Sequence, residues 1–401
     1  MHTTWTFHSA GQIVFGPNAT GQLPEILVRL KLRRLLVVTD ENLVSAGLVD
    51  SLRGLLSEAG VVSELFTGGK PEPCLDTAYA AVSAGRDFRP DGVLGLGGGS
   101  NLDLAKMTAL ILTHGGTPSM YFGEGKVPGP IMPLLCLPTT SGTGSEVSSS
   151  AVLTDTENQI KVSTLSQYLR PMVAIVDPRL THSCPPKVTA DSGIDALVHA
   201  IEAYTAVLYS DYHIPPTERS TYQGKNPLGD MLAEKAIQLI GRHLRQAVNH
   251  GKDREAREGM ALASTLAGLA FSNVGVALVH ALEYPLGGAT HCSHGAGNGL
   301  LLPYVMRFNL PSRTHEFAQI ARWLGEDTTG LNDQQAAERA ITAVEKLRAD
   351  IHIPHRLSEL GAKAEQLPGF AEKAFQIKRL MRINPREASQ ADLEGILREA
   401  L

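Results

Sequence analysis

The chain has 401 residues and a net charge of −5, from 36 basic and 41 acidic side chains. This length predicts two domains, and the lack of a basic surplus argues against a nucleic-acid partner. The four cysteines are far apart and form no CxxC pair, which argues against a disulfide scaffold and predicts a reducing, cytoplasmic location. The first residues carry no signal-peptide pattern, and we expect no association with a membrane.

Short apolar runs alternate with helical patterns in the first half of the chain. The predicted elements are strands at Arg34–Thr39, Val61–Phe66, Gly92–Leu96, Pro133–Leu137 and Met172–Val176, and an amphipathic helix over Leu75–Arg86. Before them, Thr4–Phe15 is predicted to form a hairpin or an edge strand that ends at Gly16. This alternation is typical of parallel βαβ units with helices on both faces of the sheet. We therefore predict an α/β domain over residues 1–187.

Two glycine-bearing turns follow predicted strands. The first, GLGGGSNLDLAK (Gly95–Lys106), opens a helix with Ser100 as the predicted N-cap and Asp103 in the first turn, where backbone N–H groups and the helix dipole can meet a phosphate. The second, LPTTSGTGSE (Leu137–Glu146), is rich in hydroxyl groups. Together they predict a nucleotide site at the carboxyl ends of a parallel sheet, where Asp40 can bind a ribose 2′-hydroxyl. Structural turns and a solvated strand-end aspartate are the alternatives.

Beyond Pro185-Pro186, long helical patterns predict an all-helical domain over residues 188–401. Between two of these helices, Leu208–Asn226 is polar and contains proline, and it is predicted to be a long ordered loop. Met260–Leu282 contains no Asp, Glu, Lys or Arg, and a helix buried inside the domain is favoured there over a membrane span. The last predicted helix, Ser389–Leu401, opens with capping-box spacing.

Four side chains of the helical domain form a candidate metal site. Asp195 and His199 are four residues apart, so a helix places them on one face. His280 stands in an apolar helix, and His294 follows a Gly-Gly loop that can bring it back beside His280. One carboxylate and three imidazoles suit Fe²⁺ or Zn²⁺ and leave room for a substrate oxygen. A polar stripe on a helix and an ordinary core histidine are the alternative interpretations.

Four motifs carry a family resemblance. GGGSNLDLAK, PTTSGTGSEV, DSGIDALVHAIEAY and VHALEYPLGGATHCSHGAGNGLLLP resemble, in order and spacing, those of the iron-containing (group III) alcohol dehydrogenases, from about Ile13 to the C-terminus. The resemblance implies a dehydroquinate synthase-like fold, with the active site in a cleft between a dinucleotide-binding domain and an all-helical metal domain. In the last motif it favours His294 as a ligand over His291 and Cys292. The implied ligands of Fe²⁺ or Zn²⁺ are Asp195, His199, His280 and His294.

The same resemblance implies NAD as the cofactor. Its nucleotide contacts correspond to Asp40, Gly97, Gly98, Gly99, Ser100, Asp103, Thr139, Thr140, Thr143 and Lys161. We expect hydride transfer between NAD(H) and a primary or secondary alcohol or a hydroxyacid, with an aldehyde, ketone or semialdehyde in the reverse direction. A homodimer or higher homo-oligomer is also expected.

Tyr284 departs from the family pattern, because many members carry a histidine four residues after the third ligand. With His280, Tyr284 is a candidate catalytic residue. An unperturbed tyrosine transfers protons poorly near neutral pH, so Tyr284 can instead shape the pocket, donate a hydrogen bond or simply pack. Tyr284 and the loop Leu208–Asn226 resemble the branch of hydroxyacid–oxoacid transhydrogenase, whose long insertion before the last ligand is absent here. A transhydrogenase with retained NAD and, more remotely, a dehydroquinate synthase-type lyase are the alternative functions.

Overall fold

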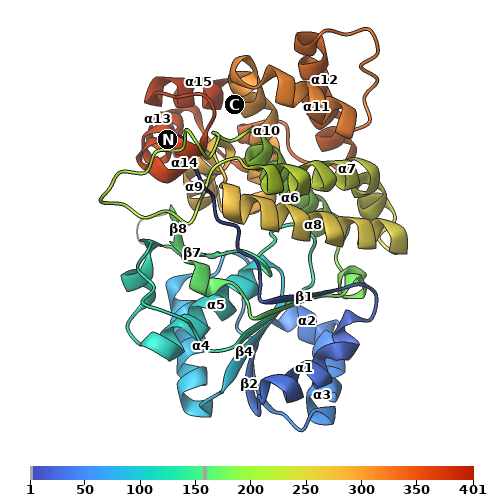
Figure 1. Ribbon diagram of the computed structural model, residues 1–401, viewed down its shortest axis with the longest axis vertical. Coiled ribbons are helices and arrows are strands. Elements are labelled where there is room, and N and C mark those ends of the chain that lie inside the picture. The colour runs from blue at the N-terminus through green and yellow to red at the C-terminus, as the bar shows by residue number, and fades with distance from the viewer. Residues whose placement is uncertain (1–2, 157–159) are drawn as a thin grey trace. The chain divides into compact units, whose positions relative to one another are not determined.

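The computed structural model describes residues 3–156 and 160–401. The chain divides into two compact units, which are described separately below. One is His8–Cys184, and the other is Pro185–Leu401 together with the N-terminal segment that ends at Phe7. The first unit combines strands and helices, and the second is built of helices (Figure 1).

A six-stranded parallel sheet forms the centre of the α/β unit, with the strand order β1-β9-β6-β4-β2-β3. Its strands are β1 Gln12–Phe15, β2 Arg34–Val38, β3 Val62–Phe66, β4 Gly92–Gly97, β6 Leu134–Pro138 and β9 Val173–Val176. The five predicted strands are confirmed, each to within about one residue at either end. The predicted N-terminal extended piece is an edge strand, although only its last residues pair with β9.

Helices cover both faces of this sheet, as the alternating pattern predicts (Figure 1). The helices are α1 (Leu23–Leu30) and α3 (Leu48–Glu58) on one face, and α4 (Leu75–Phe88) and α5 (Gly99–His114) on the other. Side chains of β2 alternate between them, so Leu35 faces the first pair of helices and Leu36 the second. Each such fully buried leucine contributes roughly 1.5–3 kcal/mol. Both layers therefore hold in place the strands that lead into the predicted turns.

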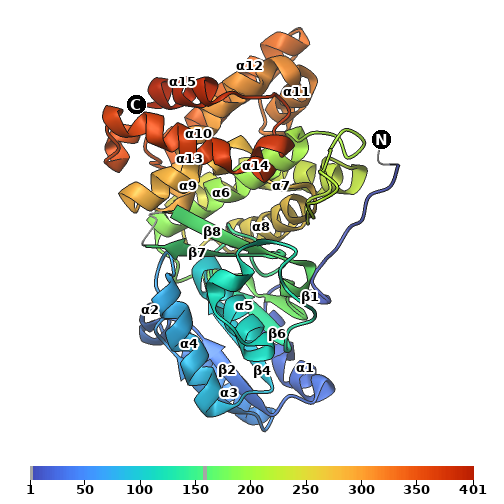
Figure 2. The ribbon, with the colours of Figure 1, turned by 90° about the vertical axis from the view of Figure 1, so that its left-hand side faces the viewer.

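A second, three-stranded sheet was not predicted from the sequence. Its order is β5-β8-β7, formed by Gly123–Glu124, Ile160–Leu165 and Ser150–Asp155. β8 pairs antiparallel with β7 and parallel with β5. Ala151 and Leu153 of β7 are buried in the same cluster as α5, and Figure 2 shows β7 and β8 next to that helix. The small sheet therefore supports the helix that follows the first glycine-rich turn.

The helical unit begins directly after the α/β unit. Its helices are α6 Pro186–Thr205, α7 Pro227–Asn249, α8 Arg254–Val274, α9 Leu278–Thr290, α10 His294–Asn309, α11 Thr314–Trp323, α12 Asp333–Asp350, α13 Leu367–Gln376, α14 Lys378–Ile383 and α15 Gln390–Ala400. The predicted capping box of α15 is confirmed, because Ser389 Oγ accepts the N–H of Asp392 while the Asp392 carboxylate accepts that of Ser389. The predicted loop between α6 and α7 is also confirmed, and its ends pair through Leu208 and Lys225.

The charge-free segment Met260–Leu282 is not the single buried helix that was predicted. α8 ends at Val274, α9 begins at Leu278, and the two helices are bent by 102°. Gly275 lies at the break with a φ of +128°, a conformation that favours glycine. Within the described ranges no single helix is long and apolar enough to cross a bilayer, although α8 and α9 taken together meet both criteria.

Candidate active site

Three of the four predicted metal ligands lie together in the helical unit. Asp195 comes from the middle of α6, His280 from the first turn of α9 and His294 from the start of α10. One oxygen or nitrogen atom of each lies within 4.8 Å of those of the other two. Asp195 and His280 are each only 2% exposed, so water screens their attraction for a cation weakly.

The chain path between His280 and His294 differs from the prediction. The predicted Gly-Gly loop is wrong, because Gly287 and Gly288 are buried inside α9 and helical. The turn comes at His291, whose φ of +54° ends the helix in the left-handed conformation. His291 and Cys292 stand outside the group of three candidate ligands.

Two buried carboxylates orient the histidines. Glu202 Oε2 lies 2.6 Å from His280 Nδ1, and Glu283 Oε2 lies 2.5 Å from His294 Nδ1. Because an ionised carboxylate only accepts hydrogen bonds, each Nδ1 carries the proton and each Nε2 presents its lone pair. Glu202 also accepts two backbone N–H groups at the start of α9, at 2.9 and 2.7 Å. A single side chain of α6 therefore positions both the helix start and the imidazole.

Asn298 of α10 lies at the point where the ligand atoms converge. Its Nδ2 donates to Asp195 Oδ1 at 2.7 Å and lies 3.2 Å from Nε2 of both His280 and His294. Three acceptors therefore share the two hydrogens of one amide group. This surplus of buried electron pairs, from one carboxylate and two imidazoles, fits the donor set of a divalent transition-metal cation.

His199, the fourth predicted ligand, lies beside this group. Its Nδ1 is 4.0 Å from Asp195 Oδ2, and its ring stacks on those of Phe271 and His280 with centroid distances of 4.1 and 4.9 Å. Its role as a ligand stays a prediction. Burial by itself raises the pKa of Asp195, but His199, His294 and His280 together hold that pKa below its usual value. The candidate ligand Asp195 is therefore ionised at neutral pH.

Tyr284 lies one helical turn after His280. It is buried, and its ring centroid is 6.3 Å from that of His294. The phenol is thus next to the candidate ligands, where a substrate-contacting residue is expected. A part in catalysis stays a prediction.

In the α/β unit, the two predicted turns meet at the carboxyl ends of the neighbouring strands β4 and β6. The Gly97 carbonyl accepts the N–H of Thr139 at 3.0 Å. Gly97 has a φ of +149°, which disfavours any side chain. A Cβ added to Gly99 would lie 2.5 Å from Thr143. The turns therefore pack against each other at a distance that only glycine permits.

Helix α5 begins two residues earlier than predicted. Gly98 is the N-cap, so the prediction that Ser100 caps the helix is wrong. Ser100 lies within the first turn, and Asp103, which was predicted to be there, lies beyond it. The glycines let the extended backbone of β4 enter the helix directly. Thr140 flanks the same point, since a Cβ added to Gly98 would lie 3.3 Å from its methyl group.

Asp40 caps α2 (Glu41–Ser45) and also contacts the first glycine-bearing turn, Gly95–Lys106. Its Oδ1 accepts the N–H groups of Asn42 and Leu43 at 2.9 and 3.1 Å, and its Oδ2 accepts the Asn101 amide at 2.7 Å. Asn101 also donates to the Leu96 carbonyl at 3.2 Å. The predicted ribose-binding aspartate is thus fixed beside the glycine-rich turn.

Asp103 and Lys161 both make contacts within the protein. Asp103 accepts the Ser145 hydroxyl at 2.6 Å and a backbone N–H of β7 at 2.9 Å. Lys106 Nζ lies 3.6 Å from Asp103 and is fully buried. Burial raises the pKa of Asp103 and lowers that of Lys106. Lys161 Nζ pairs with Glu72 at 3.0 Å. Asp103 therefore joins α5 to the second turn, and nucleotide contacts of either residue stay predictions.

Glu202, Glu283 and Asn298 belong to the site but were not identified as site residues from the sequence. Each lies three or four residues after a predicted ligand, so it shares a helix face with that ligand. That spacing is the one signal in the sequence that could have identified these three residues. It does not reveal which ligand each of them contacts, because Glu202 and Asn298 contact His280 and Asp195 on other helices.

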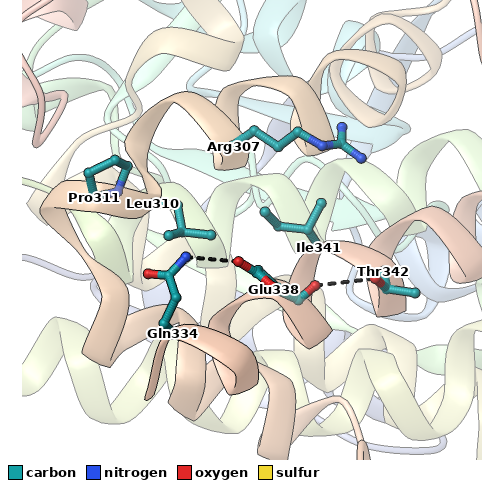
Figure 3. A pocket seen from close by; sticks show the side chains of 7 residues that line it. All are labelled: Arg307, Leu310, Pro311, Gln334, Glu338, Ile341 and Thr342. Carbon is teal, nitrogen blue, oxygen red and sulfur yellow. Dashed lines mark hydrogen bonds between the residues drawn. The ribbon is translucent and has the colours of Figure 1, made fainter. Parts of the chain in front are cut away.

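A surface pocket of about 470 Å³ lies elsewhere on the helical unit, between α10, the short turn Leu310–Ser312 and α12 (Figure 3). Its lining consists of Arg307, Leu310, Pro311, Gln334, Glu338, Ile341 and Thr342. In Figure 3, Gln334 donates to the Glu338 carboxylate and Thr342 to the Glu338 carbonyl. This lining includes none of the predicted site residues.

The sequence matches two family models that together span most of the chain. These are iron-containing alcohol dehydrogenase over residues 10–178, and the C-terminal part of the Fe-containing alcohol dehydrogenase family over residues 216–401. The chain is 42% identical to long-chain-alcohol dehydrogenase 1 of Geobacillus thermodenitrificans, over 98% of this chain and 97% of that protein. It is 37% identical to the NAD-dependent methanol dehydrogenase of Bacillus methanolicus, over 97% of both.

The structure is similar to the crystal structure of 1,3-propanediol oxidoreductase, with a TM-score of 0.92 and 37% identity over 99% of this chain and 100% of that one. These matches confirm the predicted fold class and enzyme class, an alcohol dehydrogenase, and they do not favour the transhydrogenase alternative. The chain belongs to the iron-containing alcohol dehydrogenase family.

Proposed function

We propose that this chain transfers a hydride between a primary alcohol and NAD(H), with Fe²⁺ or Zn²⁺ bound in the helical unit. The observation that carries the proposal is the convergence of Asp195, His280 and His294 on one point, where the first two side chains are buried and the third is partly exposed. The family and the relative from Bacillus methanolicus, which is named an NAD-dependent dehydrogenase, support it independently.

Asp195, His280 and His294, with His199 as the predicted fourth ligand, would hold the cation. A divalent cation bound there lowers the pKa of an alcohol hydroxyl and so favours loss of its proton at neutral pH. Glu202 and Glu283 keep each Nδ1 protonated, so that each Nε2 faces the point of convergence. Asp195 and His280 are buried, whereas the His294 side chain is 27% exposed, so electrostatic contacts are strengthened most on the side of the first two.

The two glycine-bearing turns of the α/β unit would bind NAD. The first N–H groups of α5 lack helical partners, and the positive end of the helix dipole attracts a pyrophosphate. Gly97 and Gly99 keep side chains away from this approach. The Asp40 carboxylate favours a ribose 2′-hydroxyl and repels a 2′-phosphate, which supports NAD over NADP. The nicotinamide ring supplies the redox step.

The substrate would lie beside Tyr284, which is buried next to His294. The relatives are named for methanol and long-chain alcohols, and these names support a primary alcohol as the substrate class. Tyr284 would form a wall of the pocket and donate a hydrogen bond through its phenol hydroxyl.

The experiment that tests the function follows NADH absorbance with a panel of primary alcohols, before and after removal of metal with a chelator. We expect activity that is lost on chelation and restored by Fe²⁺ or Zn²⁺. His280→Ala is expected to abolish metal binding and turnover. His291→Asn is the matched control, since asparagine tolerates the left-handed backbone of His291, which stands outside the ligand group. Turnover that survives both metal removal and His280→Ala would contradict the proposal.

We further propose a homodimer or higher homo-oligomer located in the cytoplasm. Among the described residues no cysteine forms a disulfide, which fits a reducing compartment. Light scattering coupled to size-exclusion chromatography measures the assembly, and a monomer at micromolar concentration would contradict it.

A further inference from the structure

Asn298 is the most central side chain of the candidate metal site, although it is not one of the predicted ligands. It is fully buried, and its Nδ2 lies 2.7 Å from Asp195 Oδ1 and 3.2 Å from Nε2 of both His280 and His294. Its Oδ1 is also buried and has no hydrogen-bond partner among the residues that the structure describes. The NH₂ group of the carboxamide thus donates to the candidate ligands, and its oxygen accepts no hydrogen bond from the described residues.

The orientation of this amide follows from its neighbours. The opposite orientation would bring Oδ1 within 2.7 Å of the Asp195 carboxylate oxygen, and two acceptors repel at that distance. The histidine Nδ1 atoms already donate to Glu202 and Glu283, so both Nε2 atoms are acceptors. A neutral imidazole has one lone pair at Nε2. That lone pair can accept a hydrogen from Asn298 or bind a cation, but it cannot do both.

We propose that Asn298 competes with the metal ion for the electron pairs of His280 and His294. This inference rests on the proposed function of the site. In the metal-stripped protein the Asp195 carboxylate and the two imidazoles share the two hydrogens of this amide, which helps to keep the site assembled. Binding of the cation requires the amide to release both imidazoles. Because Oδ1 has no bond to break, the release involves the donor side alone. Asn298 therefore lowers the affinity for metal and stabilises the metal-stripped fold.

A purely orienting role for Asn298 predicts the opposite result. If the amide only held Asp195 in place, its removal would weaken metal binding, because loss of such a supporting hydrogen bond typically costs about 10–100-fold in affinity. The sign of the change in affinity therefore separates competition from orientation.

The test uses Asn298→Leu, which keeps the branched shape of the side chain without donors although it is larger, and Asn298→Ala, which removes the carboxamide. Zn²⁺ affinity is measured on the full-length metal-stripped protein by competition with a chromogenic chelator, and thermal unfolding is recorded with and without Zn²⁺. We expect Zn²⁺ binding to be tighter in both variants, by up to about tenfold, because the hydrogen bond that the two imidazoles share is no longer given up. The Tm is expected to fall in the metal-stripped protein and to recover largely when Zn²⁺ is bound.

Asn309→Ala is the matched control on the same helix. Asn309 is buried and exchanges two 2.8 Å hydrogen bonds with Asn384, apart from the ligand group. It should lower the Tm equally with and without Zn²⁺ and leave Zn²⁺ affinity unchanged. Unchanged or weaker binding by both Asn298 variants would overturn the competition while leaving the metal site intact. Absence of Zn²⁺ binding by the wild-type protein would overturn the proposed function and this inference together.

Discussion

Glu202→Gln tests how far a single carboxylate sets the geometry of the metal site. Glu202 Oε2 accepts His280 Nδ1 at 2.6 Å and the N–H of Ala277 at 2.9 Å, and Oε1 accepts the N–H of Val279 at 2.7 Å. Glutamine has one acceptor oxygen and one donor NH₂, so either orientation of its amide places the NH₂ against a donor. If the NH₂ faces His280, the proton must move to Nε2, which can then no longer bind a metal.

The magnitude follows from these contacts. At least one buried hydrogen bond to a charged group is lost, at about 1.5–3 kcal/mol, and its donor is left unsatisfied. We therefore expect the free energy of unfolding to fall by about 2 kcal/mol in urea and Zn²⁺ affinity to fall about 10–100-fold. Glu255→Gln is the control, because Glu255 is 72% exposed and pairs with Arg242 at the surface, so a change below about 1 kcal/mol is expected. A Glu202→Gln protein with wild-type Zn²⁺ affinity and stability would refute this account of the site.

Three further outcomes are expected. Gly99→Ala places a Cβ 2.5 Å from Thr143, so overpacking of about 1–3 kcal/mol should weaken NADH binding measured by fluorescence titration, and adding Thr143→Ala should restore part of it. Asp40→Gly should raise kcat/KM for NADP relative to NAD, and an unchanged ratio would remove Asp40 from the cofactor site. Burial by itself raises the pKa of Asp177, but hydrogen bonds from Arg179 hold that pKa below its usual value. The stability that this pKa shift contributes is present above roughly pH 4 and is lost as pH falls through the lowered pKa of the folded state. Asp177→Asn should therefore destabilise the protein most at pH 7. Measured by urea unfolding, the difference in the free energy of unfolding between the variant and the wild type should shrink below roughly pH 4.

Local patterns were sufficient to predict the parallel sheet. Its inner strands β2, β4, β6 and β9 are buried almost throughout, so each one appears as a short apolar run between turn residues, whereas the edge strands β1 and β3 are partly exposed. Half of the residues in the strands Ser150–Asp155 and Ile160–Leu165 are polar or charged, and the second strand contains a lysine, so both lack that apolar signal. Their pairing into a separate sheet depends on packing against α5, which no local pattern encodes.

Packing also explains why the predictions around α9 were wrong. Gly287 and Gly288 suggest a loop because each glycine costs a helix up to about 1 kcal/mol relative to alanine. Both are buried in α9, where close packing outweighs that cost. The break at Gly275 is invisible in composition, since one long buried helix and two bent ones have the same apolar residues. Glu202 and Asn298 were missed for a related reason, because the groups they contact on His280 and Asp195 are distant in the sequence.

Those distances also determine when the metal can be acquired. Glu202 and His280 are 78 residues apart, and Asp195 and Asn298 are 103 apart, so no short segment of the chain contains a complete site. An unfolded or growing chain offers the cation only scattered ligands. We therefore expect that a metal at the proposed site does not template folding as it does in a small zinc finger, and that it enters a helical unit that has already folded. Loading would then be a late step, and the stability it adds would grow with the logarithm of the free metal concentration.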